Sequence, residues 1–220
     1  ICTGTVLVAC CDFRPAIEDK GWTVREDMWY GDCSPTDFPY VYSKRAAEKR
    51  AMEIAAAQSQ WTLTTLLVGG CFGPMCAPNG QGVVPMFQKY IRGGLFWPAC
   101  PPMGFPVLDI RDVAVMHSLA MTSDVTGRYI TPQKWGTFKA CCDGLKSDSR
   151  TSKCMLPFFL LPSCFKPVFA CVGPVLGIDK SMPRRLWGMA PKIDYGKTTS
   201  DFALEGFTPI GIPEMMVDTE

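Results

Sequence analysis

Tyr40 and Lys44 are the residues in this sequence whose types and spacing most clearly suggest chemistry. They lie four residues apart at the start of a helical pattern that extends from Tyr40 to Gln58, so both side chains project from the same face. A tyrosine phenol ionises only near about pH 10, but a neighbouring ammonium group stabilises the phenolate and favours proton transfer. The spacing alone is a weak signal, because on most helices such a pair is a surface contact.

Two apolar segments flank this helix and predict the sheet on which it lies. Residues 1–9 and 61–68 are short, continuous and apolar, which is typical of strands buried on both faces. A strand, a helix and a second strand make a βαβ unit with a parallel sheet. Ligands bind at the carboxyl ends of such strands. A hydroxyl at the end of the first strand, which contains Thr3 and Thr5, can hold a substrate carbonyl while Tyr40 delivers a proton to it.

The remaining elements are shorter and are separated by segments rich in Gly and Pro. The long helix is expected to bury a face of small and apolar residues, made of Ala47, Ala51, Ile54 and Ala55. Further predicted elements are a helix around 84–92, a helix over 109–122 capped by Asp109, a strand over 128–131 and a helix near 180–186. The sequence contains no internal repeat.

Composition excludes several classes of function. The chain has 220 residues, 47% of them hydrophobic, and a formal net charge of +1, which argues against a nucleic-acid binder that neutralises phosphates. His117 is the single histidine and no Cys-x-x-Cys occurs, so we predict no metal site. The 12 cysteines are expected to be reduced thiols in a cytoplasmic protein.

The segment 156–178 is apolar and carries one charge, Lys166. It is long enough to raise the question of a membrane span, but four prolines interrupt it. We expect a packed surface element and no membrane contact, with membrane association through 156–178 as the alternative.

Several motifs, in order along nearly the whole chain, resemble the extended short-chain dehydrogenases/reductases of the NAD-dependent epimerase/dehydratase superfamily. Within that family the sequence is most similar to dihydroflavonol and cinnamoyl-CoA reductases. The matching segments are Glu26-Asp-Met-Trp29, Tyr40-Val-Tyr-Ser-Lys44 with Ala47-Glu-Lys49, Gly73-Pro74, Asp109-Ile-Arg-Asp-Val-Ala114 with His117, Gly127-Arg-Tyr-Ile130, Gly177-Ile-Asp-Lys-Ser181 and Phe207-Thr-Pro209.

The resemblance implies an α/β fold with a Rossmann-type parallel sheet and flanking helices, plus a smaller irregular α/β region. Residues 1–132 would be the carboxyl-terminal part of the Rossmann-type domain, with a substrate-loop insertion at about 75–106, and residues 133–220 a substrate-binding region. The implied function is NAD(P)H-dependent reduction of an aldehyde or ketone to an alcohol. Epimerase, dehydratase and hydroxysteroid dehydrogenase chemistry use the same residues and stay open as alternatives.

The family's site residues carry over by position. Tyr40 would donate the proton, Lys44 would make it more acidic and bind the nicotinamide ribose, and Thr5 would orient the carbonyl. The cofactor would also contact Leu67, Val68, Gly69, Gly70 and Cys71. The expected substrate pocket contains Phe87, Tyr90, Phe96, Trp97 and Met103. Two departures from the family are Thr3-Gly4-Thr5 in place of Thr-Ser-Ser, and Leu67-Val68 in place of Asn-Pro or Arg-Pro.

One family motif is absent from these 220 residues, namely the Gly-x-x-Gly-x-x-Gly turn that holds the cofactor pyrophosphate. We therefore expect a fragment of a reductase. The resemblance implies NADP(H) or NAD(H) as its cofactor, with NADP(H) preferred, and a small carbonyl compound or alcohol as its partner. The alternative is a non-catalytic remnant or interaction module, whose first strand would be an exposed sheet edge. His117, the Asp109–Asp112 cluster and Arg184-Arg185 are expected to be structural, the arginines on a solvated helix face.

Overall fold

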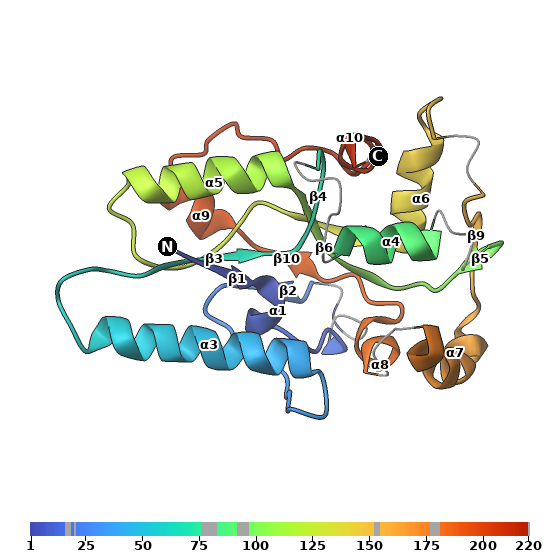
Figure 1. Cartoon of the computed structure of the whole chain (residues 1–220), viewed down its shortest axis with the longest axis horizontal. Coiled ribbons are helices and arrows are strands. Elements are labelled where there is room, and N and C mark those ends of the chain that lie inside the picture. Colours follow the sequence, from blue (N-terminus) through green and yellow to red (C-terminus); the bar gives the residue numbers. More distant parts are fainter. Residues whose placement is uncertain are drawn as a thin grey trace.

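The computed structural model describes residues 1–15, 19, 21–75, 83–91, 97–151, 155–176 and 181–219 (Figure 1). The strands are β1 (Cys2–Thr5), β2 (Thr23–Val24), β3 (Thr64–Val68), β4 (Gly70–Phe72), β5 (Ala99–Cys100), β6 (Gly104–Asp109), β7 (Gly127–Ile130), β8 (Lys134–Thr137), β9 (Phe159–Leu160) and β10 (Lys192–Ile193). The α-helices are α1 (Val6–Ala9), α3 (Pro39–Ala56), α4 (Val83–Ile91), α5 (Ile110–Thr122), α6 (Phe138–Lys146), α7 (Lys166–Val172), α8 (Met182–Leu186), α9 (Gly196–Asp201) and α10 (Ile212–Asp218). Two 3₁₀-helices, η1 (Ser163–Phe165) and η2 (Gly173–Leu176), flank α7.

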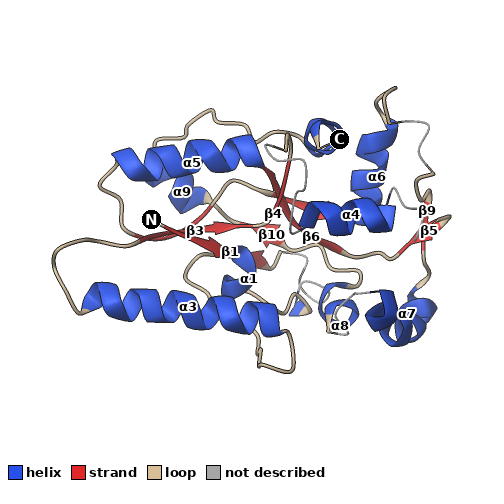
Figure 2. Ribbon diagram, viewed as in Figure 1, coloured by secondary structure: helices blue, strands red, loops and turns tan. Residues whose placement is uncertain are grey.

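The central sheet is parallel and has the strand order β1-β3-β7. Thr5 is the register partner of Val68, and Leu67 is the partner of Ile130. Helix α3 covers one face of the sheet and α5 the other, so the sheet is the middle of three layers (Figure 2). This arrangement confirms the predicted α/β class with a parallel sheet and flanking helices.

The first strand is shorter than the sequence suggests. The predicted strand over 1–9 is wrong beyond Thr5, because Val6–Ala9 form a single helical turn. Thr5 has extended backbone angles and caps this turn by accepting a hydrogen bond from the Leu7 N–H at 3.4 Å. The second strand likewise begins at Thr64 instead of Trp61, whose side chain is exposed.

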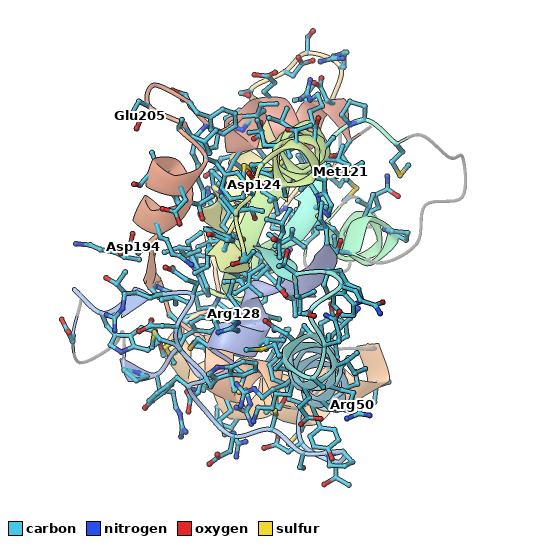
Figure 3. All side chains as sticks on the ribbon, turned by 90° about the vertical axis from the view of Figure 1, so that its left-hand side faces the viewer. Arg50, Met121, Asp124, Arg128, Asp194 and Glu205 are labelled. Atoms are coloured by element: carbon cyan, nitrogen blue, oxygen red, sulfur yellow. The ribbon has the colours of Figure 1, made fainter. Side chains whose placement is uncertain are left out.

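The buried face of α3 also differs from the prediction. Val41 and Glu48 are buried, whereas Ala47 and Ile54 are exposed. The reason is an ion pair, because Glu48 turns inward to meet Arg128, which points into the interior in Figure 3. A helix that buries a charged residue does not show its inner face as an apolar stripe.

The other strands form smaller sheets. One sheet has the strand order β4-β6-β8, in which β4 is parallel to β6 and β6 is antiparallel to β8. Strand β2 pairs with β10 in a two-stranded parallel sheet, and β5 pairs with β9 in another. One large core cluster joins Leu67 and Ile130 of the central sheet and Val6 of α1 to Trp187 and Met216. The two halves of the chain are thereby packed on a common core.

Several predicted elements are found close to their expected bounds. Asp109 caps α5 and accepts a hydrogen bond from the Arg111 N–H at 2.8 Å. Helices α4 and α8 and strand β7 lie where the sequence places them. Within the described ranges, none of the helices has the length and apolar character needed to cross a membrane.

Candidate active site

The first turn of α3 presents Tyr40 and Lys44 to solvent. Phe38 precedes the helix with φ of 66°, and Pro39 occupies its first turn. The Tyr40 side chain is half exposed, and Nζ of Lys44 lies 5.9 Å from the centroid of its ring. The two side chains therefore share one face, as their spacing predicts, and both are open to a ligand.

Thr5 lies at the edge of the sheet toward which this turn faces. Because α3 leads back to the start of β3, its first turn lies near the carboxyl ends of the parallel strands, where β1 ends at Thr5 and β3 at Val68 (Figure 1). Helix α3 also packs against β1 and α1. The oxygen of the Thr5 hydroxyl accepts the hydrogen bond that caps α1, and the hydroxyl hydrogen can donate a hydrogen bond to a substrate carbonyl.

The segment after β3 crosses from the central sheet to the β4-β6-β8 sheet. The Leu67 carbonyl accepts hydrogen bonds from the Thr131 hydroxyl at 3.0 Å and the Gln133 amide at 3.2 Å, which fixes the end of the strand. A Cβ on Gly69 would overlap the Pro106 carbonyl oxygen and lie 2.6 Å from Oε1 of Gln133. Only glycine fits this crossing, so its place in the sequence has a steric cause.

Cys71, the last residue of the expected cofactor-contact segment, is a partly buried thiol. Burial raises its pKa to about 11, and the negative charge of Asp109 adds to the effect. The thiol is therefore protonated at neutral pH and is not an ionised nucleophile. This segment offers a ligand backbone groups and a neutral side chain.

Arg45, five residues after Tyr40, ties α3 to the chain that follows β1. Its Nη1 donates to the Gly31 carbonyl at 2.7 Å, and its Nη2 donates to the Val8 carbonyl at 3.0 Å. The planar guanidinium thus bridges α1 and the loop at Gly31 with fixed geometry. Nothing in the local sequence pattern indicates this role.

Arg185 fixes the segment immediately before α3. Its Nη2 lies 2.8 Å from the Asp37 carboxylate, its Nη1 donates to the Cys11 carbonyl at 3.1 Å, and its guanidinium stacks 5.4 Å from the Phe38 ring centroid. The expected solvated face is wrong for Arg185, which is buried because these partners lie across the fold from α8. Arg184 is exposed, as expected, and also pairs with Asp37 at 2.8 Å.

A buried ion pair holds the far part of α3 to β7. Arg128 Nε donates to Glu48 Oε1 at 2.7 Å, and its Nη1 donates to the carbonyls of Glu26 and Met28. Its Cζ lies 4.0 Å from the centroid of the Trp29 ring. The pair therefore also positions the loop that contains the Glu26–Trp29 motif.

The structure describes three of the five side chains expected to line a substrate pocket. Phe87 and Met103 are buried in the main core, where Phe87 packs 5.1 Å from Phe72, while Trp97 is exposed. The Tyr90 side chain and Phe96 lie outside the described residues. The pocket assignment remains a prediction.

His117 and Asp109 have structural partners. Nδ1 of His117 lies 2.9 Å from the Val113 carbonyl and Nε2 lies 2.8 Å from the Thr3 hydroxyl, which links α5 to β1. The buried Asp109 carboxylate forms a two-point ion pair with Arg111, which also reaches Asp218 at 3.0 Å. These contacts agree with the expectation that His117 and Asp109 are structural.

Solved structures with this arrangement include several reductases. The yeast methylglyoxal/isovaleraldehyde reductase Gre2, solved with NADPH, matches with a TM-score of 0.69 and 19% identity over 99% of this chain and 60% of its own. Vestitone reductase from alfalfa (Medicago sativa) matches with a TM-score of 0.65 and 16% identity over 99% of this chain and 61% of its own. The Bordetella bronchiseptica enzyme WbmG, solved with NAD and UDP, matches with a TM-score of 0.61 and 17% identity over 99% of this chain and 57% of its own.

The chain shares its α/β fold with these solved structures. It spans about 60% of the length of these solved structures. No family model and no curated protein matches the sequence. At such low identity the likeness establishes the fold, and the chemistry rests on the residues themselves.

One hollow among the described residues lies away from Tyr40. A cavity of about 520 Å³ lies beside the carboxyl end of α3, lined by residues such as Met52, Ala55, Trp61 and Arg128. Met52 is 12 residues beyond Tyr40 on the same helix, about 18 Å along its axis. This hollow is at the opposite edge of the sheet from the tyrosine and lysine, so it is not their substrate site.

Proposed function

We propose that this chain contains the catalytic residues of an NAD(P)H-dependent oxidoreductase that reduces an aldehyde or ketone to an alcohol. The observation that carries the proposal is the placement of Tyr40 and Lys44 together, open to solvent, at the edge where β1 ends in Thr5. The fold shared with an NADPH-bound aldehyde reductase supports it.

The residues of this chain divide the chemistry between them. Thr5 donates a hydrogen bond to the substrate carbonyl oxygen and orients it toward Tyr40. Tyr40 transfers its phenolic proton to that oxygen as negative charge develops on it. The Lys44 ammonium group stabilises the tyrosinate that remains. Arg45 and Arg185 hold α3 in place, so that the donor geometry is set before the substrate binds.

The cofactor is proposed to be NADP(H) or NAD(H), with NADP(H) preferred by analogy to the neighbours solved with NADPH. When bound, the reduced nicotinamide supplies hydride to the carbonyl carbon. The residues fit one end of this group: Tyr40 and Lys44 provide a hydroxyl and an ammonium donor suited to ribose hydroxyls. The 220 residues contain no glycine-rich turn for the pyrophosphate, so the fit is to the nicotinamide end alone.

The test is NADPH consumption by the product of the complete reading frame that encodes these residues. Aldehydes and ketones of increasing size are supplied, and NADPH loss is compared with the alcohol formed. We expect equal amounts of both with at least one carbonyl compound. Replacing Thr5 with Val removes the orienting hydroxyl and should lower turnover, whereas Thr5→Ser keeps a hydroxyl and should retain most of it. Failure of every carbonyl compound to consume NADPH would contradict the proposal.

A further inference from the structure

An exposed apolar surface lies at the end of the molecule that contains β9 and α7, the right-hand end in Figure 1. We name it the 155–175 surface. Its members are large hydrophobic side chains with more than two fifths of their area exposed: Met155, Phe158, Phe159, Leu160, Phe165, Val168, Val172 and Val175. Eight such residues within 21 positions exceed the scattered exposure that is normal for a protein surface.

The helical part of this surface is a continuous stripe. The helices η1, α7 and η2 follow one another without a break from Ser163 to Leu176. Phe165, Val168, Val172 and Val175 recur at intervals of three and four residues, the spacing of one helix face. Phe169 lies at the edge of this stripe by the same spacing, but it is buried, and its ring centroid lies 5.7 Å from that of Trp187. This contact anchors α7 to the rest of the fold and leaves the stripe exposed.

The charged residues of the segment that forms the 155–175 surface have one sign. The sequence contains no acidic residue between Asp148 and Asp179. Lys166 begins α7, and Nζ of Lys146 lies 5.7 Å from the Phe158 ring centroid. Aromatic and aliphatic side chains with lysines beside them are suited to the headgroup region of a membrane whose lipids carry negative charge.

We propose that the 155–175 surface binds in the plane of an anionic lipid membrane. The apolar stripe enters the boundary between headgroups and acyl chains, while Lys146 and Lys166 contact the headgroups. The contact is interfacial, since no described helix is long and apolar enough to cross a bilayer. A surface that binds a protein partner is expected to have a polar rim with both basic and acidic residues. The segment between Asp148 and Asp179 contains basic residues but no acidic ones.

The experiment measures co-sedimentation of the 220-residue chain with phosphatidylcholine vesicles that contain or lack phosphatidylserine. We expect binding that is stronger with phosphatidylserine and weaker at high salt. The double variant Val168→Asp/Val175→Asp changes the two most exposed valines of the stripe and should lower the partition coefficient at least about tenfold. The matched control, Val115→Asp/Met121→Asp, adds the same charge at exposed positions on α5 and should bind as the unchanged chain does.

A second measurement does not depend on variants. Cys164 and Cys171 are exposed thiols within this segment. Bound vesicles should protect both from a water-soluble alkylating reagent, as read by mass spectrometry. The proposal is overturned if the unchanged chain binds neither kind of vesicle, or if both double variants bind equally. It is also overturned if the chain is a dimer that the Val168/Val175 variant alone converts to monomer, because a second copy would then cover the surface.

Discussion

Replacing Arg128 with Ala tests the ion pair that holds α3 to the sheet. The change leaves the Glu48 carboxylate buried without its cation, since only 2% of that side chain is exposed. It also removes the donor to the Glu26 and Met28 carbonyls and the cation over Trp29. We expect a substantial loss of stability, because an uncompensated buried charge is costly to the folded state.

The size of the effect follows from the burial of both partners. Removing one member of a buried pair costs about 3–5 kcal/mol, and in a chain of this length 1 kcal/mol lowers Tm by about 2–4 °C. The predicted fall in Tm is therefore about 6–20 °C, with a matching shift of the urea midpoint followed by tryptophan fluorescence. Glu48 Oε2 and Arg128 Nη2 already lack hydrogen-bond partners among the described residues. The double variant Glu48→Leu/Arg128→Met should therefore recover much of the loss.

The chain offers a matched control for this measurement. Arg50 forms an ion pair with Glu53 at 2.9 Å on the same helix, but both side chains are about two-thirds exposed, and Arg50 lies at the surface in Figure 3. Arg50→Ala should cost less than about 1 kcal/mol. If Arg128→Ala costs no more than Arg50→Ala, the buried pair does not stabilise α3 as described.

Three further predictions concern sterics, thiols and the cofactor. Gly69→Ala should destabilise the chain by about 1–3 kcal/mol in urea titrations, because a Cβ would overlap the Pro106 carbonyl. An unchanged urea midpoint would show that the backbone between β3 and β4 shifts to accept the methyl group. Burial raises the pKa of Cys10 and Cys141 from 9.0 to about 12, so above about pH 9 the folded chain keeps protons that the unfolded chain releases. The free energy of unfolding should therefore fall as pH rises above about 9. A free energy of unfolding that does not change with pH in that range would contradict this. Both thiols should alkylate far more slowly than exposed Cys164 in mass spectrometry. The 220-residue chain should show no saturable NADPH binding by titration, because it lacks the glycine-rich turn that would bind the pyrophosphate. Tight NADPH binding would refute this reasoning.

Local signals predicted the parts of the fold that depend on local chemistry. The Asp109 cap of α5, the helix that begins near Tyr40 and the parallel pairing of its flanking strands follow from capping, periodicity and β-branched content. The Tyr40–Lys44 pair is also local, because four residues of helix fix their common face. These features need no partner from elsewhere in the chain.

Contacts between distant segments explain what the sequence did not predict. Arg185 is buried because Asp37 and Cys11 lie about 150 or more residues away in the chain yet adjacent in space. Ile54 is exposed because Glu48 faces inward instead. The end of β1 depends on the Thr5 side chain, which caps a turn where the sequence pattern continues as a strand.

The central claim is that Tyr40 delivers the proton to a substrate carbonyl. Its most direct test compares Tyr40→Phe with Tyr42→Phe, which removes a phenol two residues away that is also partly exposed on α3. Both variants are made in the product of the complete reading frame, and NADPH-dependent turnover is measured with the best carbonyl substrate. We predict that Tyr40→Phe lowers kcat about 10²–10⁴-fold while Tyr42→Phe leaves it within about twofold. Equal turnover by the two variants would contradict the account.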